Sequence, residues 1–571
     1  MVSPVEAIVG LVTLTLLFYF IRTKKSQKPS KPLPPKIPGG WPVIGHLFYF
    51  DDDSDDRPLA RKLGDLADKY GPVFTFRLGL PLVLVVSSYE AIKDCFSTND
   101  AIFSNRPAFL YGEYLGYNNA MLFLTKYGPY WRKNRKLVIQ EVLCASRLEK
   151  LKHVRFGEIQ TSIKNLYTRI DGNSSTINLT DWLEELNFGL IVKMIAGKNY
   201  ESGKGDEQVE RFRKAFKDFI ILSMEFVLWD AFPIPLFKWV DFQGHVKAMK
   251  RTFKDIDSVF QNWLEEHVKK KEKMEVNAEG NEQDFIDVVL SKMSNEYLDE
   301  GYSRDTVIKA TVFSLVLDAA DTVALHMNWG MALLINNQHA LKKAQEEIDK
   351  KVGKDRWVEE SDIKDLVYLQ TIVKEVLRLY SPGPLLVPHE NVEDCVVSGY
   401  HIPKGTRLFA NVMKLQRDPK LWSNPDKFDP ERFFAADIDF RGQHYEFIPF
   451  GSGRRSCPGM TYAMQVEHLT IAHLIQGFNY KTPNDEPLDM KEGAGLTIRK
   501  VNPIEVVITP RLTPELYGTA AATCCTATAG AAGTGGTAAT TACGCCTCGC
   551  CTGACACCTG AGCTTTATTA A

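Results

Sequence analysis

The chain has 571 residues, 24% of which are charged, and its formal net charge is −2. This balance excludes the basic patch or stripe that marks a nucleic-acid-binding protein, so no nucleic-acid partner is expected. At roughly 150 residues per domain the length suggests about three domains, but only one stretch has the composition of a long linker.

Residues 1–21 are predicted to form a transmembrane anchor. The run from Ala7 to Ile21 is apolar apart from Thr13 and Thr15, and residues 1–21 as a helix would reach about 31 Å, which just spans a bilayer. Basic residues follow the run instead of preceding it. A cleaved signal peptide is the alternative, but its charges would stand before the apolar run. The positive-inside rule therefore predicts a cytosolic body behind a single span.

Residues 22–45 are basic and then rich in proline, and they are predicted to link the anchor to the body of the protein. Five prolines lie between Pro32 and Pro42. Their fixed backbone angles and missing N–H donors argue against helix or sheet and favour a stiff linker. No second linker of this length precedes Tyr517, so residues 46–517 are predicted to form one catalytic domain.

Helical periodicity dominates this domain, and strand-like runs are short, which predicts a mainly α fold with small β-sheets. Long helices are expected at residues 179–196, 209–229, 246–271, 306–336 and 363–380. Strands are expected at residues 73–78, 82–87 and 505–509.

The helix expected at residues 306–336 is apolar on every side except for one polar stripe. At 100° per residue its polar side chains fall within about one hundred degrees of one another. They are Thr311, Ser314, Asp318, Asp321 and Thr322. Such a stripe in a buried helix is either a satisfied hydrogen-bond network or one wall of a site.

A glycine-rich loop surrounds one cysteine near the carboxyl end, where residues 450–459 read Phe-Gly-Ser-Gly-Arg-Arg-Ser-Cys-Pro-Gly. A thiolate that stays deprotonated on a metal needs backbone N–H donors around its sulfur, and the three glycines allow a tight loop to supply them. Arg455 adds a cation. The helix expected from Met460 to Phe478 would aim its positive end at Cys457. The alternative, a small buried core cysteine, is disfavoured by this combination.

The last 54 residues, Gly518 to Ala571, contain only Gly, Ala, Thr and Cys, which are the four nucleotide letters. Read as triplets, they encode Val501 to Tyr517 and a stop codon. We interpret residues 518–571 as an artefact without ordered structure, against the alternative of a cysteine-rich metal-binding tail. Twelve of the sixteen cysteines lie there. The other four lack the spacing of a disulfide framework or a zinc site, as expected in a reducing compartment.

The cysteine loop matches the signature Phe-x-x-Gly-x-Arg-x-Cys-x-Gly at Phe450, Gly453, Arg455, Cys457 and Gly459. On this motif the chain resembles the cytochrome P-450 family. The resemblance implies the cytochrome P-450 fold, haem b as cofactor, Cys457 as the thiolate ligand of the haem iron, and Arg455 beside a haem propionate. It also implies electrons from NADPH through NADPH–cytochrome P-450 reductase, and a place in the endoplasmic reticulum membrane in contact with lipid.

Three further residues match positions at which the family binds the haem propionates. Trp131 and Arg135 match Trp-x-x-x-Arg, in which both side chains reach a propionate. His389, in Val-Pro-His-Glu, occupies the place of a further propionate donor.

An ion-pair network is the next landmark. Glu375 and Arg378 are three residues apart on one helix face, where an ion pair forms readily. Arg432, in Pro-Glu-Arg-Phe, supplies the third member. The resemblance implies a structural role for these residues in holding the chain that carries Cys457.

Asp321 and Thr322 match the family's acid–threonine pair, which implies proton delivery to dioxygen at the iron and places the polar stripe on the distal side of the haem. Asp318, Ala319 and Val323 depart from the usual residues. A carboxylate above the haem is costly to bury without a partner. Our hypothesis is that Asp318 pairs with the ammonium of a basic substrate or, failing that, with the water network that activates dioxygen.

The chain resembles one plant group within the family more closely, the nicotine N-demethylases. The stretches that carry this likeness are residues 103–107, 315–324 and 493–500. The likeness implies hydroxylation of the N-methyl carbon of nicotine, followed by collapse of the carbinolamine to nornicotine and formaldehyde. Three alternatives stay open: a monooxygenase for another plant alkaloid or secondary metabolite, a haem-thiolate isomerase or dehydrase, and an inactive haem-binding variant.

Ser381 is a further departure, because relatives usually read Pro-Pro-Gly-Pro where this chain has Ser-Pro-Gly-Pro. Losing one proline from a rigid turn costs about 0.4 to 1 kcal/mol through the unfolded state. A folded enzyme is therefore expected.

Overall fold

A computed structural model describes most of the chain between residues 31 and 518. The described residues are 10, 31–50, 55–170, 176–199, 207–225, 227–234, 237–238, 241, 243–274, 284–293, 301–435, 437–495 and 497–518. The predicted anchor, apart from residue 10, and nearly all of the predicted artefact at residues 518–571 lie outside them. Among the described residues, no helix combines the length and the apolar character needed to cross a membrane.

Helices make up most of the described structure. The α-helices are α2 (Leu59–Tyr70), α3 (Tyr89–Lys93), α4 (Leu110–Tyr114), α5 (Pro129–Leu137), α6 (Ala145–Lys150), α7 (Lys152–Thr168), α8 (Leu179–Ala196), α9 (Glu207–Met224), α10 (Leu228–Ala231), α12 (His245–Met274), α13 (Phe285–Lys292), α14 (Arg304–Asn336), α15 (Gln338–Lys351), α16 (Val367–Leu379), α17 (Val412–Leu415), α18 (Arg432–Ala435) and α19 (Met460–Gly477). Short 3-10 or π segments are η1 (Leu47–Tyr49), η2 (Asp94–Thr98), η3 (Ile102–Ser104), η4 (Val138–Val142), η6 (Glu360–Asp365), η7 (Gly453–Arg455) and η8 (Pro514–Tyr517).

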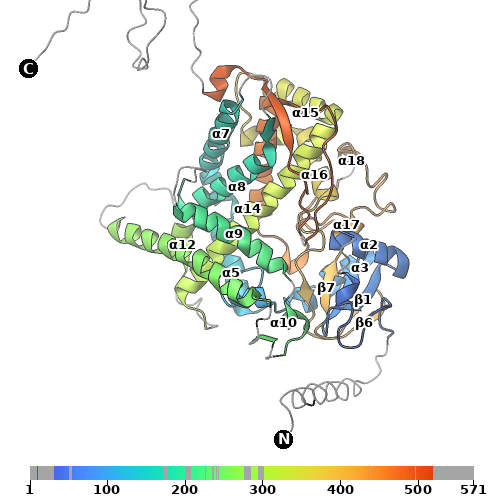
Figure 1. The fold of residues 1–571 in the computed structure, drawn as a ribbon. Helices are drawn as coiled ribbons and strands as arrows, with labels where there is room; N and C mark the ends of the chain where they lie inside the picture. The colour runs from blue at the N-terminus through green and yellow to red at the C-terminus, as the bar shows by residue number, and fades with distance from the viewer. Residues whose placement is uncertain are drawn as a thin grey trace, which may run out of the picture. The chain divides into compact units, whose positions relative to one another are not determined.

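The strands form small sheets. They are β1 (Val73–Arg77), β2 (Leu82–Val86), β3 (Thr176–Asn178), β4 (His389–Glu390), β5 (Cys395–Val397), β6 (Tyr400–Ile402), β7 (Arg407–Ala410), β8 (Phe478–Lys481) and β9 (Glu505–Pro510). One sheet has the order β1-β2-β7-β4, with β2 and β7 parallel, a second has the order β3-β9-β8, and β5 pairs with β6. Helices α7, α8, α9, α12 and α14 gather on one side, and β1, β6 and β7 lie with α2 and α3 on the other (Figure 1).

Local sequence signals set several helix ends. Ser303 accepts a hydrogen bond from the Thr306 N–H at 3.2 Å and so caps the first turn of α14. Asn178 caps α8 in the same way, and that helix ends at Gly197, whose φ of 64° is left-handed. The predicted helix at residues 179–196 is therefore confirmed to the residue.

Helix α14 runs through the core and packs against α8, α12, α13, α15, α16 and α19. Its side chains between Val307 and Ile335 are nearly all buried. This confirms the prediction that the helix at residues 306–336 is buried, because a helix with apolar side chains on every side must be covered all round.

Two expectations need correction. The predicted helix at residues 209–229 is two helices, since α9 ends at Met224 and α10 begins at Leu228. The proline-rich segment also makes sheet contacts, because Ile37 donates to the Thr75 carbonyl at 3.1 Å and is 1% exposed. Ile37 is not itself a proline, so its N–H is free to pair with β1.

Candidate functional site

The loop at residues 450–459 folds back on itself around Cys457. The Cys457 N–H donates to the Phe450 carbonyl at 2.9 Å, and the Gly459 N–H faces the Cys457 sulfur. Gly459 is also the residue before α19, so the positive end of this helix lies beside the thiol.

Gly453 has a steric reason to be glycine. Its φ is 68°, and a Cβ there would lie 2.2 Å from Oδ1 of Asp100. The backbone here must therefore approach Asp100 closely, which only glycine allows. Asp100 in turn accepts hydrogen bonds from the backbone and side chain of Arg454, which hold the loop against the segment after η2.

Trp131 contacts two guanidinium groups beside this loop. The Arg455 guanidinium is 4.3 Å and the Arg135 guanidinium 5.4 Å from the centre of the indole. Arg135 donates to the Ser456 carbonyl at 2.7 Å, and Arg455 donates to the Ser104 carbonyl at 2.7 Å. The structure thus brings Trp131, Arg135 and Arg455 together next to Cys457.

Arg106 belongs to the same cluster, although the sequence argument did not single it out. It is buried and donates to the carbonyls of Phe123 at 3.0 Å, Val387 at 2.7 Å and Pro388 at 2.8 Å. Val387 and Pro388 lie 281 and 282 positions away in the chain, so only the place of Arg106 in the stretch at residues 103–107 could have drawn attention to it.

His389 completes the cluster. Its Nδ1 lies 2.7 Å from the Phe103 carbonyl and so carries a proton. Burial, together with repulsion from Arg106 and Arg455, lowers the pKa of His389 well below its ordinary value. The ring is therefore neutral, with its one proton on Nδ1. Nε2 could donate a hydrogen bond only if a nearby anion favoured the binding of a second proton to the ring.

The arginines of this cluster have few compensating charges. In the described part of the chain no carboxylate forms an ion pair with Arg106, Arg135 or Arg455, and Nη1 of Arg455 is buried without a partner. Burial and mutual repulsion lower the pKa of Arg455 to about 8 and that of Arg106 to about 10. Buried cations without partners are costly, so the cluster fits an anionic group bound beside Cys457.

One face of α14 borders the same internal space. Most of its central residues are buried, but Leu315, Ala319 and Thr322 are half-buried and Asp318 is exposed. Positions three and four apart share a helix face. Asp318 and Cys457 both lie deep in the protein yet keep accessible surface, and the charge of Asp318 raises the pKa of the Cys457 thiol, so the two side chains face a common interior space.

The polar stripe predicted on α14 divides into three parts. Thr311 donates to Oδ1 of Asn134 at 3.1 Å, and Ser314 accepts from the Leu122 N–H at 3.1 Å, so these two are satisfied structural groups. Asp321 pairs with Arg499 and lines a separate cavity of about 270 Å³. The expectation that the whole stripe faces one site is wrong. The stripe is wide enough for its side chains to contact different parts of the protein, namely Asn134, Leu122 and Arg499.

Thr322 and Asp318 contact each other on one face of α14. The Thr322 hydroxyl donates to the Asp318 carbonyl, a hydrogen bond within one helix turn. Burial raises the pKa of the Asp318 carboxyl to about 7, and the charge of Arg106 opposes this rise. Burial likewise raises the pKa of the Cys457 thiol to about 11, against the Gly459 N–H, which lowers it.

Comparison with known proteins identifies the family. A family model described as cytochrome P-450 matches residues 34–506. The chain belongs to the cytochrome P-450 family. Membership means haem as the cofactor and electrons drawn from NADPH through a reductase. The cationic cluster fits that group, because haem carries two propionates and Cys457 lies among the arginines that would meet them.

Similar relatives include several plant enzymes. A curated nicotine N-demethylase of Nicotiana tomentosiformis is 92% identical over 518 residues, which is 90% of this chain and 100% of the relative. Another, from Nicotiana tabacum, is 91% identical over 517 residues, again 90% and 100%. A flavonoid-6-hydroxylase of Ocimum basilicum is 45% identical, covering 88% of this chain and 96% of that protein.

Solved structures show the same fold at lower identity. A zebra fish cytochrome P-450 with abiraterone aligns with a TM-score of 0.65 at 23% identity, covering 80% of this chain and 99% of that one. The prediction of the cytochrome P-450 fold is confirmed.

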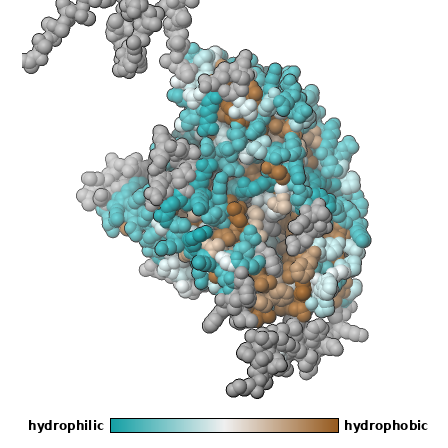
Figure 2. All heavy atoms as spheres, viewed as in Figure 1, coloured by the Kyte–Doolittle hydropathy of each residue, from teal (hydrophilic) through white to brown (hydrophobic). Residues whose placement is uncertain are grey.

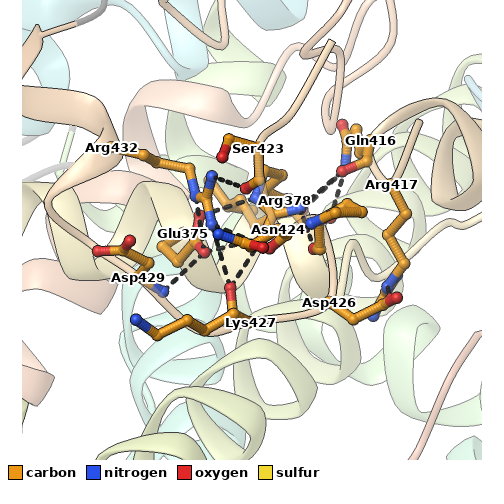
Figure 3. A network of polar contacts seen from close by, with 12 residues as sticks. Glu375, Arg378, Gln416, Arg417, Ser423, Asn424, Asp426, Lys427, Asp429 and Arg432 are labelled. Atoms are coloured by element: carbon orange, nitrogen blue, oxygen red, sulfur yellow. Dashed lines mark hydrogen bonds and ion pairs between the residues drawn. The ribbon is translucent and has the colours of Figure 1, made fainter. Parts of the chain in front are cut away.

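The predicted ion-pair network of this cytochrome P-450 is largely buried. Glu375 holds Arg378 through two hydrogen bonds of 2.8 Å, and both side chains are 0% exposed. Arg432 donates to the same carboxylate at 3.1 Å, and the Asp429 N–H donates to it at 2.9 Å (Figure 3). Both arginines also bind backbone carbonyls between residues 416 and 427, so the network fixes the segment that precedes the Cys457 loop.

Ser381 has a contact that a proline could not make. It is 3% exposed, and its hydroxyl donates to the Pro449 carbonyl at 3.4 Å, directly before Phe450. This long hydrogen bond partly offsets the lost rigidity of the turn.

Proposed function

We propose that this cytochrome P-450 is a monooxygenase that removes the N-methyl group of nicotine. The observation that carries the proposal is its identity of 91–92% to nicotine N-demethylases over their whole length. The reaction consumes nicotine, dioxygen, NADPH and a proton, and it yields nornicotine, formaldehyde, NADP⁺ and water. The carbon–hydrogen bond of the methyl group is oxidised first, and the carbon–nitrogen bond then breaks as the carbinolamine collapses.

Residues around Cys457 would hold the haem. Cys457 is the proposed iron ligand, and Phe450, Gly453 and Gly459 shape its loop. Arg106, Arg135, Arg455, Trp131 and His389 are the proposed propionate contacts. Bound haem supplies the oxidising centre that inserts one oxygen atom into the methyl carbon–hydrogen bond. The chain itself orients the thiolate and neutralises the propionates.

Asp318 is the proposed partner of the substrate ammonium. Its carboxyl faces the same interior space as Cys457, and within the described part of the chain it forms no ion pair. A cationic amine would stabilise the ionised form of this carboxyl. Pairing on the pyrrolidine nitrogen would hold the adjacent methyl group in a fixed position relative to Cys457.

Thr322 and Asp321 are the proposed proton-handling residues. The Thr322 hydroxyl lies beside the Asp318 carbonyl on the face towards Cys457, whereas Asp321 pairs with Arg499 on the neighbouring face. A proton would pass from Asp321 to the Thr322 hydroxyl through water, because the two side chains point in different directions. The retained acid–threonine pair favours a monooxygenase over an isomerase or dehydrase.

Attachment to the endoplasmic reticulum membrane through residues 1–21 is part of the proposal. Exposed apolar side chains support it, since Trp41 and Phe48 are each 69% exposed. The turn after β1 contacts Ile44 on one side and Ala231 on the other, which brings residues 41–49 close to α10. Figure 2 shows apolar side chains gathered in the lower part of the face drawn, where Figure 1 labels α10. Lipid contact there would place the body of the enzyme against the bilayer surface.

Formaldehyde release from nicotine tests the function directly. Microsomes that contain the full chain are assayed with NADPH, with and without the plant reductase. Formaldehyde and nornicotine in equal amounts, formed only with reductase, are expected. Product without reductase would indicate chemistry of another class. Absence of product together with a normal thiolate-ligated spectrum would leave a haem-binding protein that is inactive towards nicotine, and other plant alkaloids would then be tried.

A further inference from the structure

Asn187 binds the backbone of α14 at the turn that carries the proposed reaction residues. It lies on α8 and is 0% exposed. Its Nδ2 donates to the Ala319 carbonyl at 2.8 Å and to the Ala320 carbonyl at 2.6 Å. Its Oδ1 is buried without a partner among the described residues. The reverse orientation would set an oxygen against two carbonyl oxygens, so both amide hydrogens must point at α14.

The same turn is bound from its opposite side by a hydroxyl. Thr322 donates to the carbonyl of Asp318, the residue before Ala319. Three consecutive carbonyls of α14 therefore accept a side-chain hydrogen bond. In a regular helix each of them accepts from the N–H four residues later. The two hydrogen bonds from Asn187 add to these helical bonds and tie this turn of α14 to α8, which resists local opening of the turn.

We infer that Asn187 is a positioning residue for the segment between Asp318 and Thr322. It touches neither the expected haem nor the substrate. From α8 it fixes the outer side of the turn, and this sets the direction in which the Asp318 carboxyl and the Thr322 hydroxyl leave the helix on the inner side. The inference rests on the proposed monooxygenase function and adds a residue that governs how much of the NADPH consumed leads to oxidation of the substrate.

The Asn187→Leu variant removes both donors at nearly constant size. Amide hydrogen exchange of residues 320–326 in the haem-loaded, substrate-free enzyme should accelerate about tenfold, the effect of losing one or two ordinary hydrogen bonds. The amount of formaldehyde formed per NADPH consumed should fall severalfold. The rest of the NADPH should be consumed in forming hydrogen peroxide, because NADPH, a proton and dioxygen then give NADP⁺ and peroxide without oxidising the substrate. The dissociation constant of nicotine should rise by less than it does in Asp318→Asn, since Asn187→Leu keeps the carboxylate itself.

Gln345 provides a matched control. It is a buried amide on α15, and its Nε2 donates to the carbonyls of Ile475 at 3.3 Å and Phe478 at 3.2 Å, at the end of α19 away from Cys457. The Gln345→Leu variant should lower the unfolding temperature by a similar amount and leave exchange in residues 320–326 and the peroxide yield unchanged.

The positioning role is overturned if Asn187→Leu loses stability as Gln345→Leu does but keeps wild-type exchange and peroxide yield. If Asn187→Leu does not take up haem, Asn187→Ser is used instead, because its hydroxyl keeps one hydrogen-bond donor. The exchange rate and the peroxide yield should then change in the same direction but by less. The exchange measurement needs no nicotine. It therefore tests Asn187 even if wild-type enzyme releases no formaldehyde, an outcome that would overturn only the proposed function.

Discussion

At the scale of single residues, Asp318 has a charge that depends strongly on its surroundings. Burial raises its pKa from 3.8 to about 7. Because the folded protein holds this proton more tightly than the unfolded chain, the group lowers stability progressively as pH rises from about 4 to 7. A bound ammonium would pull the pKa back down and so couples substrate binding to ionisation of Asp318.

Nicotine binding should therefore strengthen as pH rises from 6 to 8. With a pKa of about 7, the ionised share of Asp318 grows from roughly a tenth to nine tenths over this range, which limits the gain in affinity to about tenfold. Spectral titration of the ferric enzyme measures it. The Asp318→Asn variant should bind more weakly at pH 8 and lose the pH dependence while keeping kcat for bound substrate. An unchanged KM in this variant rules out the pairing.

Residues whose role depends on distant neighbours escaped the sequence argument. Cys457 and Arg455 stand in one compact motif, so the spacing of the motif sufficed to predict them. Arg106 and Asn187 act on carbonyls 281 and 132 positions away along the chain. Nothing in the local sequence around an isolated asparagine or arginine specifies such contacts, since any carbonyl is an acceptor for them.

At the scale of elements, the Glu375 network shows how a short sequence spacing gains importance through burial. Glu375 and Arg378 would be a weak pair on an exposed helix. Here both are 0% exposed, and the segment from Gln416 to Lys427 wraps around them. Removal of one charge would leave the other buried and without compensation.

The Glu375→Gln variant should accordingly lose about 3–5 kcal/mol of unfolding free energy, the usual effect of breaking a buried pair. Urea unfolding followed by circular dichroism measures the loss. Haem content should fall in parallel, because the same network holds the chain before Cys457. As a control, Asp439→Asn removes a surface pair with Arg441 at 3.4 Å and should leave the midpoint unchanged. A small loss for Glu375→Gln would mean that the arginines are satisfied by carbonyls alone.

Helix positions were predictable wherever apolar periodicity and caps agreed, as for α8 and α14. The break between α9 and α10 was not, because residues 209–229 keep an apolar pattern through it. Contacts made by the second helix explain the break. Asp230 accepts from the Leu110 N–H at 2.8 Å, and the Ala231 carbonyl accepts from Leu80 at 2.9 Å. These long-range contacts override the helical propensity of the segment.

At the scale of the whole molecule, Tyr517 packs into the core near the end of the described residues. This side chain is 1% exposed and stacks on Tyr167, with ring centres 4.2 Å apart. The neighbouring Leu516 carbonyl accepts from the indole of Trp357 at 3.0 Å. Leu516 and Tyr517, the last residues before Gly518, are thus tied to the core. The prediction that residues 518–571 are an artefact stays a prediction.

Two truncations test where the functional chain ends. A variant that stops after Tyr517 should match the full chain in unfolding temperature and carbon-monoxide difference spectrum. A variant that stops after Thr513 should lose about 3–5 kcal/mol, the usual effect of removing a large buried aromatic side chain. Thermal unfolding of both measures the difference. Equal stability of the two variants would show that the Tyr167 stack contributes little, and destabilisation by the first cut would give residues 518–571 a role.

Because Trp131 contacts both Arg135 and Arg455, its fluorescence should report how much of the protein has bound haem. An indole this close to the expected propionates would transfer its excitation to haem and emit almost no light, whereas the same indole in the haem-free chain would fluoresce. The other eight tryptophans give a background, which a Trp131→Phe variant would reveal. The difference between the two proteins during haem titration would follow insertion at this one position, without substrate, reductase or turnover.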